Sequence, residues 1–570
     1  MRSVPFGDVC VRGDLAVRSG LNYARLEGEW YRPEEVFKAD SHGWPGDWEG
    51  RVLLALTLLE QSTHRTAAYL EEIMAQLPAH LNERGYFGPI LPDGQFDEQH
   101  FGGHSWMLRA LAEYYAYRKK PETKAILTRM VDNFLMPAKG TFSRYPIEPV
   151  RRFEQQDTWI LSKLQTKTKH HAETSDAGCV FIIIDGASAV YEHDRRPELR
   201  GIIDEMISRF MEMDLEALHI QTHATLSASR GILRMYELTG EDQYLEMARA
   251  RYALYRDAAW TETYGNYNWF GAPRWTESCA IIDSFMVAVT LWKHTREEQY
   301  LHDAHLIYFN ALSHGNRVNG SFGTDRCCGG RETEENLYLA PINYETYWCC
   351  TMRGGEGFSR TIEYSYFTDG DDVYVPMYNS ADITLRLNTG TLSLTLETHY
   401  PYHGEVLATV TDALLRGPVA LKFFVPCWAV NPELRFNGES VTLRIERGFA
   451  TVRGVLRAGD VIALTLPAEV RAVETMAHSI QGYHKFMYGP MVLGLQVQVA
   501  DNSLDGNRFE NYAESRFKAA GEAHIPRDAD IRRTADDAFS AQGTDLILTS
   551  LCSVRSLTRE DTMRQVLFAD

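Results

Sequence analysis

The chain has 570 residues, with 58 Lys and Arg against 77 Asp and Glu and a formal net charge of −19 at pH 7. This acidity argues against a nucleic-acid partner and against an anionic membrane surface, because both require a basic face. Hydrophobic residues make up 44% and aromatic residues 11%, which excludes a disordered chain and permits large cores. The length predicts about two to four domains.

No run of about 18 or more apolar residues is present, so we expect no membrane-spanning helix. Residues 1–20 lack the continuous apolar stretch of a secretion signal. A cytoplasmic chain is therefore the simplest interpretation. Monomer and homodimer both remain open, because nothing in the sequence distinguishes them.

Helices are predicted over the first 365 or so residues, where apolar residues recur at three- and four-residue steps. The pattern covers 49–61, 65–83, 105–118, 122–135, 179–192, 197–213, 223–238, 242–257, 279–294, 298–313 and 356–367. Polar joints separate these segments, and the joint at 239–248 resembles the one at 295–304. Repeated helical hairpins can close their own core as two concentric rings, which predicts an (α/α)6 barrel. Periodicity alone leaves an open solenoid as the alternative.

Strands replace helices near Asp369. Apolar and polar residues alternate over 372–377, 381–387, 391–396, 406–410 and 420–425, which is typical of half-buried strands. Asn437-Gly438 predicts a hairpin turn, because both residues accept positive φ angles. Short strands at this spacing predict β-sandwich, jelly-roll-like modules after the barrel.

We therefore expect three parts: a catalytic (α/α)6 barrel over 1–368, a β-sandwich over 369–500, and a C-terminal arm with closing strands over 501–570. The last part begins with a polar, poorly patterned stretch at 501–540. Strand character returns at 545–549.

The nine cysteines are an odd number, so they cannot all pair within the chain. In a reducing compartment we expect free thiols and, where they cluster, a metal or catalytic site. Two adjacent pairs occur, and five of the nine cysteines fall between residues 279 and 350. This clustering is the first indication of chemistry.

Four residues of this region form a candidate metal site. Glu277 and Cys279 lie just ahead of the helix predicted near 280, and Cys349 and Cys350 lie in a loop ahead of the helix predicted near 356. Three thiolates and one carboxylate suit tetrahedral Zn²⁺. The alternative is that these are small buried residues without a metal.

A second cysteine pair competes for the same role. Cys327-Cys328 could supply the ligands in place of 349 and 350, or could form a vicinal disulfide.

The elements Trp275-Thr-Glu277-Ser-Cys279-Ala and Trp348-Cys-Cys350, between a helical half and a β-sandwich, resemble glycoside hydrolase family 127 and its relative, family 146. Family 127 comprises β-L-arabinofuranosidases. Further matching elements lie in the sandwich at 397–404, 424–428, 436–438, 458–460 and 488–492. The likeness runs along most of residues 40–495.

The resemblance implies a zinc-dependent, retaining hydrolase that releases a terminal sugar, with a β-L-arabinofuranoside as the candidate substrate. Cys349 would attack the anomeric carbon and form a thioglycosyl intermediate, while Glu277, Cys279, Cys349 and Cys350 bind zinc. A general acid must protonate the leaving oxygen. The family's acidic residue aligns with Glu262 when one residue is deleted, although no glycine precedes Glu262 here.

Candidate residues for binding the sugar come from two arguments. His104 and His223 match pocket positions of the family. Asp47 and Trp269 lie in loops at helix ends, and sugar sites use carboxylates for hydroxyl groups and aromatic rings for C–H faces.

Two other functions remain open. A lyase or epimerase on the same barrel would use His and Tyr side chains for proton transfer and keep zinc structural. A non-catalytic sugar-binding protein would lack a carboxyl group within reach of the glycosidic oxygen. In each case the expected partner is a carbohydrate, whose identity and linkage the sequence leaves open.

Overall fold

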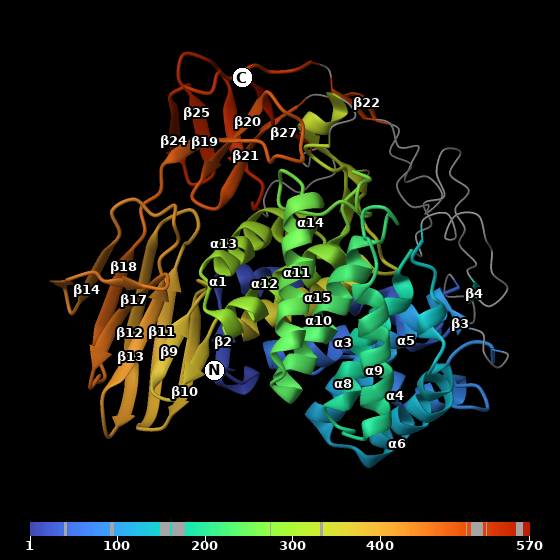
Figure 1. Cartoon of the computed structure of the whole chain (residues 1–570). Helices are drawn as coiled ribbons and strands as arrows, with labels where there is room; N and C mark the ends of the chain where they lie inside the picture. The colour runs from blue at the N-terminus through green and yellow to red at the C-terminus, as the bar shows by residue number, and fades with distance from the viewer. Residues whose placement is uncertain are drawn as a thin grey trace.

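Helices form the body of the molecule, a β-sandwich lies on one side of it, and a further sheet holds the C-terminus, as Figure 1 shows. This computed structural model describes residues 1–38, 43–91, 96–148, 160–161, 177–273, 275–330, 334–497, 499–502, 517–519, 521–553 and 563–570. The predicted order, helices first and strands after, is confirmed.

Six helices form an inner ring in which each packs against the next and the last returns to the first. In ring order they are α3 (Asp47–Thr63), α5 (Glu98–Arg118), α8 (Ile183–Tyr191), α10 (Thr222–Thr239), α12 (Ser278–Thr295) and α15 (Cys350–Glu363). Because α15 packs on α3, the ring is closed and the open solenoid is excluded.

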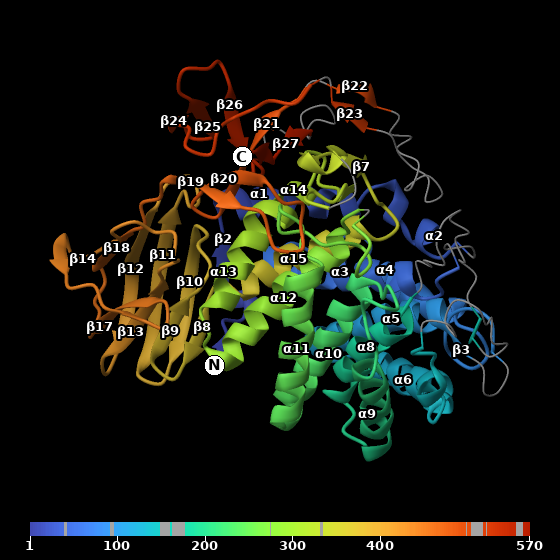
Figure 2. The ribbon, with the colours of Figure 1, turned by 45° about the horizontal axis from the view of Figure 1, so that its top comes forward.

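An outer helix accompanies each inner one, so the described residues form the predicted (α/α)6 barrel (Figure 2). The outer helices are α1 (Gly13–Leu26), α4 (Leu70–Gln76), α6 (Pro121–Met130), α9 (Pro197–Met211), α11 (Asp242–Ala258) and α13 (Gln299–Leu306).

The helices of the inner and outer rings differ in how much of their surface is hydrophobic and buried. The inner helix α12 is buried along nearly its whole sequence, SCAIIDSFMVAVTLWKHT. The outer helix α11 buries only one stripe, at Tyr244, Leu245, Ala248, Arg251, Tyr252 and Tyr255. A helix that is apolar all round belongs inside a core, whereas a single stripe covers one neighbour.

One predicted helix begins earlier than expected. The segment predicted over 356–367 is α15, which starts at Cys350. Gly354 and Gly355 lower its helix propensity, but the fold requires them. A Cβ atom at Gly354 would lie 2.1 Å from the ring of Phe322, and one at Gly355 would lie 2.8 Å from Leu59 of α3. The glycines therefore let α15 approach its neighbours closely.

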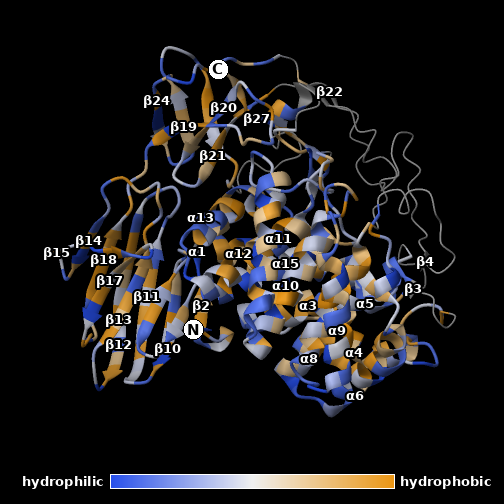
Figure 3. Cartoon of the chain, viewed as in Figure 1, coloured by the Kyte–Doolittle hydropathy of each residue, from blue (hydrophilic) through white to orange (hydrophobic). Residues whose placement is uncertain are grey.

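Two sheets pack face to face as the sandwich. One has the order β1-β8-β9-β13-β17-β16 and the other β15-β14-β18-β12-β11-β10-β2. The main strands are β8 (Phe367–Asp369), β9 (Asp372–Val375), β10 (Ala381–Leu387), β11 (Gly390–Thr398), β12 (Glu405–Leu415), β13 (Val419–Phe424), β14 (Glu433–Phe436), β15 (Glu439–Val441), β16 (Ile445–Glu446), β17 (Phe449–Gly454) and β18 (Val461–Thr465). Hydrophobic and hydrophilic residues alternate along them (Figure 3), as the sequence predicts.

Two details of the sandwich bear on the sequence predictions. Asn437 and Gly438 both have positive φ angles, 52° and 83°, and connect β14 to β15, so the hairpin turn is confirmed. At the N-terminus, β1 (Arg2–Ser3) and β2 (Val9–Val11) pair with β8 and β10. The first residues of the predicted barrel region therefore belong to the sandwich.

A third sheet joins strands on both sides of the boundary predicted at residue 500. It contains β19 (Val470–Glu474), β20 (Tyr483–Tyr488), β21 (Met491–Gln496), β24 (Ile531–Ala535), β25 (Ala538–Ala541), β26 (Ile547–Ser550), β27 (Arg564–Gln565), β28 (Phe568–Ala569) and β6 (Tyr338–Leu339). The three-part division of the chain stays a prediction, although the strand pairing favours a boundary near residue 468. The arm expected over 501–540 lies partly outside the described residues.

In the described part of the chain, every helix is too short or too polar to cross a membrane.

The centre of the inner ring is charged rather than apolar. Five inner helices contribute ionic side chains, all of them buried except the partly buried Arg234: Arg109, Asp185, Arg230, Arg234, Asp283, Arg353 and Glu356. Four guanidinium groups thus face three carboxylates. A buried charge is tolerated only when it is paired, so these side chains fix the positions of the helices that carry them.

Asp185 illustrates the pairing. Its carboxylate lies 3.0 Å from Arg109, 3.4 Å from Arg230 and 2.6 Å from Arg234. Burial alone would raise the pKa of Asp185, but these three arginines hold it at about 2. The carboxylate therefore stays ionised, and its interactions contribute to stability at neutral pH.

Replacing Asp185 tests this network. We expect Asp185→Asn to lower the free energy of unfolding by about 3–5 kcal/mol, because it leaves buried arginines without their partner. In the wild-type protein, the contribution of Asp185 to the free energy of unfolding is lost as the pH falls from about 4 towards 2, because the pKa of Asp185 is lower in the folded than in the unfolded state. Urea unfolding followed by circular dichroism measures both effects.

The matched control is Asp530→Asn, which breaks the exposed pair with Arg532. We expect a change within about 0.5 kcal/mol there. An equally small change at Asp185 would contradict the structural role of the network.

Candidate metal centre and active site

Two helix N-termini build the cluster that the cysteines predict. Glu277 is the residue preceding α12, and Cys279 lies in the first turn of that helix. Cys349 precedes α15 and Cys350 is its first residue. Negative charge is stabilised at a helix N-terminus, so both positions favour thiolates and a carboxylate.

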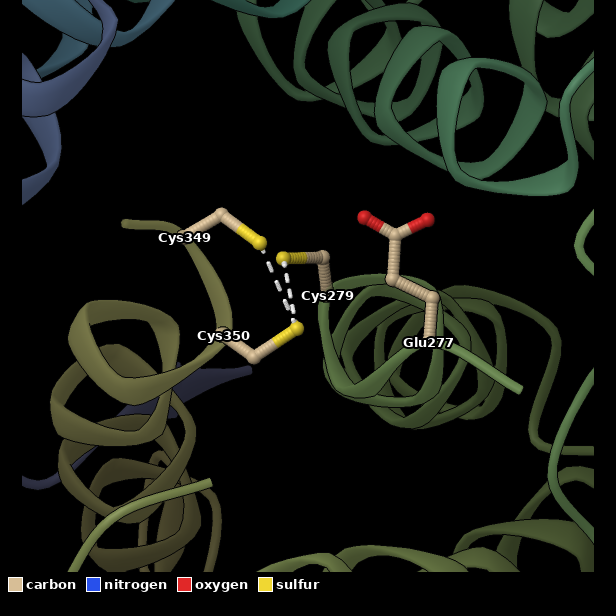
Figure 4. A group of neighbouring side chains, drawn as sticks. All are labelled: Glu277, Cys279, Cys349 and Cys350. Carbon is tan, nitrogen blue, oxygen red and sulfur yellow. Dashed lines mark hydrogen bonds between the residues drawn. The ribbon is translucent and has the colours of Figure 1, made fainter. Parts of the chain in front are cut away.

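The four side chains converge, and Figure 4 shows the three sulfur atoms directed at one another. One ligand atom from each residue lies within 4.8 Å of all the others. The Sγ atom of Cys350 lies 3.4 Å from that of Cys349 and 3.8 Å from that of Cys279. These separations are far longer than a disulfide bond, and all three thiols are free.

The donor set fits a divalent cation. Burial raises the pKa of Glu277 to about 8 and that of Cys279 to about 11. The Oε2 atom of Glu277 is buried without a hydrogen-bond partner. Without a cation, the site would therefore hold protonated groups and an unsatisfied oxygen, whereas a zinc ion would satisfy three thiolates and a carboxylate together.

The ligands differ in their access to solvent. Glu277, Cys279 and Cys350 are buried, whereas Cys349 is partly exposed. Of the four residues in the cluster, Cys349 is thus the one that a molecule from solvent can reach.

Arg51 provides a positive charge beside the cluster. Its Nη1 atom donates to the Sγ atom of Cys279 at 3.4 Å, and its Nε atom donates to Asp47 at 2.8 Å. The predicted sugar-binding residue Asp47 therefore acts on the site through Arg51, one helical turn further along α3.

His223 links the site to the ion network. Its Nδ1 atom lies 3.1 Å from Asp283, while its buried Nε2 atom has no hydrogen-bond partner. The imidazole is close enough to Glu277 to oppose the larger effect of burial on the pKa of that carboxyl group. His223 is thus a predicted site residue that the structure brings to the cluster.

The loop that carries the predicted residue Trp269 also contacts Glu277. Asn266 accepts a hydrogen bond from the backbone of Glu277 at 3.2 Å, and the backbone of Asn268 accepts one from Thr222 at the start of α10, at 2.8 Å. Both amide atoms of Asn268 are buried and without a partner.

The structure shows what the predicted site residue His104 contacts. Its Nε2 atom accepts a hydrogen bond from the backbone of Phe87 at 3.1 Å, and its Nδ1 atom lies 2.8 Å from the carbonyl oxygen of His100. Its ring stacks on Phe134. With both nitrogens engaged and the ring fully buried, His104 holds a loop in place instead of a sugar.

Trp269 also packs rather than presenting a surface. Its ring meets Trp275 edge to face, with centroids 5.6 Å apart, in a small cluster with Ala272 and Ile342. Only 8% of the residue is exposed. This leaves no open face on which a sugar ring could stack.

Glu262 does not suit the role of general acid. The side chain is fully buried and pairs with Lys485 of β20 at 2.7 Å. Burial alone would raise the pKa of Glu262, but Lys485 brings it below the usual value. A general acid needs a raised pKa and an open path to the substrate, and this carboxylate has neither.

The competing cysteine pair stays apart from the cluster. Cys327 and Cys328 are buried free thiols, and the Sγ atom of Cys327 lies 3.5 Å from the carbonyl oxygen of Asn266. The structure thus favours 349 and 350 over 327 and 328 as ligands.

Sequence reasoning missed Arg51 and Asn268. The Asp47–Arg51 spacing of four residues on a helix is a signal that could have indicated the pair. Nothing local marks Asn268, because the burial of its amide without a partner follows from contacts between segments that are far apart in the chain.

Comparison with known proteins supports the same family. A protein-family model for the middle domain of GH127 β-L-arabinofuranosidases matches residues 372–468, which lie in the sandwich. No curated protein matches the chain in sequence.

Three solved structures resemble the whole chain with a TM-score of 0.68. One is described as a glycoside hydrolase, at 15% identity, covering 100% of this chain and 97% of that one. Another is a GH127 β-arabinofuranosidase, at 14% identity with the same coverage. The third is a GH127 β-L-arabinofuranosidase from Geobacillus stearothermophilus T6, at 14% identity, covering 99% of this chain and 100% of that one.

At identities this low, the structural likeness shows the fold. Together with the match in the sandwich, it confirms the resemblance to family 127 that the sequence predicts, at low sequence identity.

The ion pair between Glu262 and Lys485 can be tested by replacing each residue with methionine, singly and together. We expect Lys485→Met to lower the free energy of unfolding by about 3–5 kcal/mol, because it leaves Glu262 as a buried unpaired charge. Adding Glu262→Met should restore most of that loss, since an apolar pair needs no charge compensation. Chemical unfolding of the two single variants and the double variant measures the coupling. Strictly additive losses would contradict a structural ion pair.

Proposed function

We propose that this divergent relative of the GH127 β-L-arabinofuranosidases is a zinc-dependent, retaining glycoside hydrolase that releases a terminal sugar. The observation that carries the proposal is the Glu277, Cys279, Cys349 and Cys350 cluster at the mouth of an (α/α)6 barrel. The enzyme class rests on the family match in the sandwich. The candidate substrate is a β-L-arabinofuranoside, the class named for the relatives.

Cys349 is proposed as the nucleophile because it is the partly exposed member of the cluster. A thiol reacts as its thiolate, and bound zinc would supply the positive charge that keeps the four ligands deprotonated. The nucleophile would thus exist at neutral pH, in the place that a second carboxylate takes in ordinary retaining glycosidases.

In the first step, the Sγ atom of Cys349 attacks the anomeric carbon, a C–S bond forms and the C–O bond to the leaving group breaks. The leaving oxygen takes up one proton. In the second step, water attacks the same carbon, the C–S bond breaks and the thiolate is regenerated. Two inversions give net retention, and the balance is one glycoside and one water to one sugar and one alcohol.

His223 is proposed as the group that gives and recovers the proton. Its Nδ1 atom is oriented by Asp283, which leaves the unpartnered Nε2 atom for the substrate. Asp283 holds the imidazole in one orientation, as a carboxylate orients the imidazole in other hydrolases. Glu262, the general acid expected from the sequence, is held in a buried ion pair with Lys485.

Asn268 is proposed as a contact for sugar hydroxyl groups. A buried amide without partners is costly, and a hydroxyl group can satisfy its donor and its acceptor at once. Its loop contacts Glu277 through Asn266, and His223 Nε2 and Glu277 Oε2 are likewise buried without a hydrogen-bond partner.

The Asp283–His223 pair also favours a second candidate, a lyase or epimerase that uses this imidazole for proton abstraction. Zinc would then be structural, and Cys349 would not form a bond to the sugar. The two candidates differ in their dependence on the Cys349 thiol.

Metal analysis tests the centre itself. We expect protein purified without chelators to contain about one zinc per chain, because four ligands of this type complete a tetrahedral site. Cys279→Ser should lose most of the metal, since it removes a buried thiolate ligand. The matched control is Cys10→Ser, at an exposed cysteine outside the cluster, which should retain it. Zinc-free wild-type protein would contradict the proposal.

Removing the nucleophile separates the two candidate functions. We expect Cys349→Ala to lose at least about a thousandfold in kcat on a β-L-arabinofuranoside while circular dichroism shows an intact fold, because the thioglycosyl step becomes impossible. Release of arabinose is the measurement. Full activity in this variant, or an unsaturated or epimerised product, would instead favour the lyase or epimerase.

A further inference from the structure

A basic pocket lies where the C-terminal end of α12 meets one sheet of the sandwich. Its volume is about 470 Å³, and its lining includes Trp292 and Arg296 of the barrel. Trp292 stacks on Phe449 of β17 with ring centroids 5.6 Å apart. Trp292 also follows the candidate metal ligand Cys279 by 13 residues on α12, which corresponds to about 20 Å along the helix axis. The pocket is therefore separate from the candidate active site.

Strand register assembles the pocket on one face of the sheet that contains β9, β13 and β17. Lys422 of β13 pairs with Tyr374 of β9 and with Thr451 of β17, so these three side chains lie in one row. Phe449 and Arg453 lie two residues before and after Thr451, and side chains two residues apart in a strand share a face. The residues between them on β13 and β17 are buried. The pocket thus lies on the side of the sheet that faces away from the sandwich core.

Positive charge predominates in the pocket. Five basic side chains line it: Arg296, Lys422, Arg444, Arg447 and Arg453. Asp369 lies 3.3 Å from Arg296. Asp372 lies 2.7 Å from Lys422 and 3.1 Å from Arg453. With Glu446, which also lines the pocket, three carboxylates face five basic groups, in a chain whose net charge is −19.

Arg444 and Arg447 differ from the other three cations in having no carboxylate partner. Both are exposed, and within the described residues neither forms an ion pair. By contrast, the ring of Tyr374 holds two of the paired cations. The Lys422 Nζ atom lies 4.5 Å from its centroid, and the Arg296 guanidinium lies 5.1 Å from it. The unpaired positive charge of the pocket is therefore that of Arg444 and Arg447.

The backbone at Arg447 is an unfavourable one for arginine. Arg447 and Gly448 connect β16 to β17 and have positive φ angles of 50° and 78°. Such a two-residue turn favours Asn, Asp or Gly at its first position, because a larger side chain crowds the backbone there. A Cβ atom at Gly448 would lie 2.9 Å from Glu298 of the barrel and 3.0 Å from the Phe424 ring. The turn is thus fixed between barrel and sandwich, and Arg447 lines the pocket at a conformational cost.

We propose that this pocket binds a carboxylated saccharide, either a sugar acid or an oligosaccharide that contains one. A guanidinium group binds a carboxylate through two parallel hydrogen bonds, and Arg444 and Arg447 lack that partner. The pocket is larger than a lone anion, and its volume lies within the range of about 300–1,000 Å³ that is typical of small-molecule sites. Thr442 and Thr451 also line it, and their hydroxyl groups can hydrogen-bond to those of a sugar. The choice of a saccharide over other carboxylates rests on the proposed function.

Isothermal titration calorimetry of the full chain tests the ligand class with three probes: a trimer of galacturonic acid, the neutral trimer of galactose, and inorganic phosphate. We expect saturable binding of the acidic trimer that weakens as NaCl is raised, because salt screens exposed charges. The neutral trimer should bind at least about tenfold more weakly. Equal binding of the two trimers, or binding of phosphate without binding of the acidic trimer, overturns the proposal.

Two variants place that binding in the pocket. Arg447→Asn removes the charge and gives the turn a residue that accepts positive φ, so the melting temperature should stay unchanged or rise. Arg444→Gln removes the other unpaired charge. We expect each variant to bind the acidic trimer at least about tenfold more weakly, because a hydrogen bond between charged groups contributes at least that much.

The matched control is Arg457→Gln. It removes the same charge from an exposed arginine of the sandwich that does not line the pocket, and it should leave the affinity within about twofold of wild type. Wild-type affinity in both pocket variants, or an equal loss in Arg457→Gln, overturns the assignment of the pocket.

The outcomes distinguish this pocket from the proposed active site. Calorimetry requires no turnover, and we expect both pocket variants to keep the wild-type kcat on methyl β-L-arabinofuranoside. Hydrolysis of that glycoside without binding of the acidic trimer overturns the pocket and leaves the proposed function intact. Binding of the trimer that is lost in the pocket variants supports the pocket, even if the chain hydrolyses no arabinofuranoside.

Discussion

The buried ion network at the centre of the barrel is the constraint on which the rest of the site depends. Arg230 of α10 pairs with both Asp283 of α12 and Glu356 of α15, and all three side chains are buried, so none of these helices can slide or rotate without leaving a charge unpaired. Breaking such a pair costs more than forming it contributes. The network thus specifies where the helices begin, and their first turns carry the metal ligands.

Function follows from that arrangement in a short chain of contacts. Asp283 orients His223, while Asp47 orients Arg51 towards Cys279. The helix N-termini and Arg51 favour anionic ligands. Within the cluster, Cys349 is the ligand that is partly exposed to solvent. The inner helices therefore stabilise the barrel through the ion pairs at its centre, and they carry the candidate metal ligands at their N-termini. Proteins commonly place functional residues in this way, at the edge of a rigid scaffold.

Much of the fold could be predicted because it depends on local periodicity. Three- and four-residue spacing identified most of the helices, and alternation identified the strands of the sandwich. Predictions failed where long-range contacts overrode local preference. Gly354 and Gly355 lower helix propensity, yet α15 runs through them because its neighbours require close approach. Strands β1 and β2 were missed because they are short and gain their stability from partners more than 300 residues away.

By itself, the sequence determined the class of fold and the four residues of the candidate metal centre, since residue type and spacing decide which side chains can share a cation. The tertiary structure alone decided which other polar groups are paired and which are buried without a partner. Glu262 forms an ion pair with Lys485, which lies 223 residues away in the sequence. Asn268 and His223 keep buried polar atoms that have no hydrogen-bond partner. Trp30 likewise stacks on Tyr347, which lies in a distant part of the sequence. Burial and pairing are properties of packing between distant segments, and no local pattern encodes them.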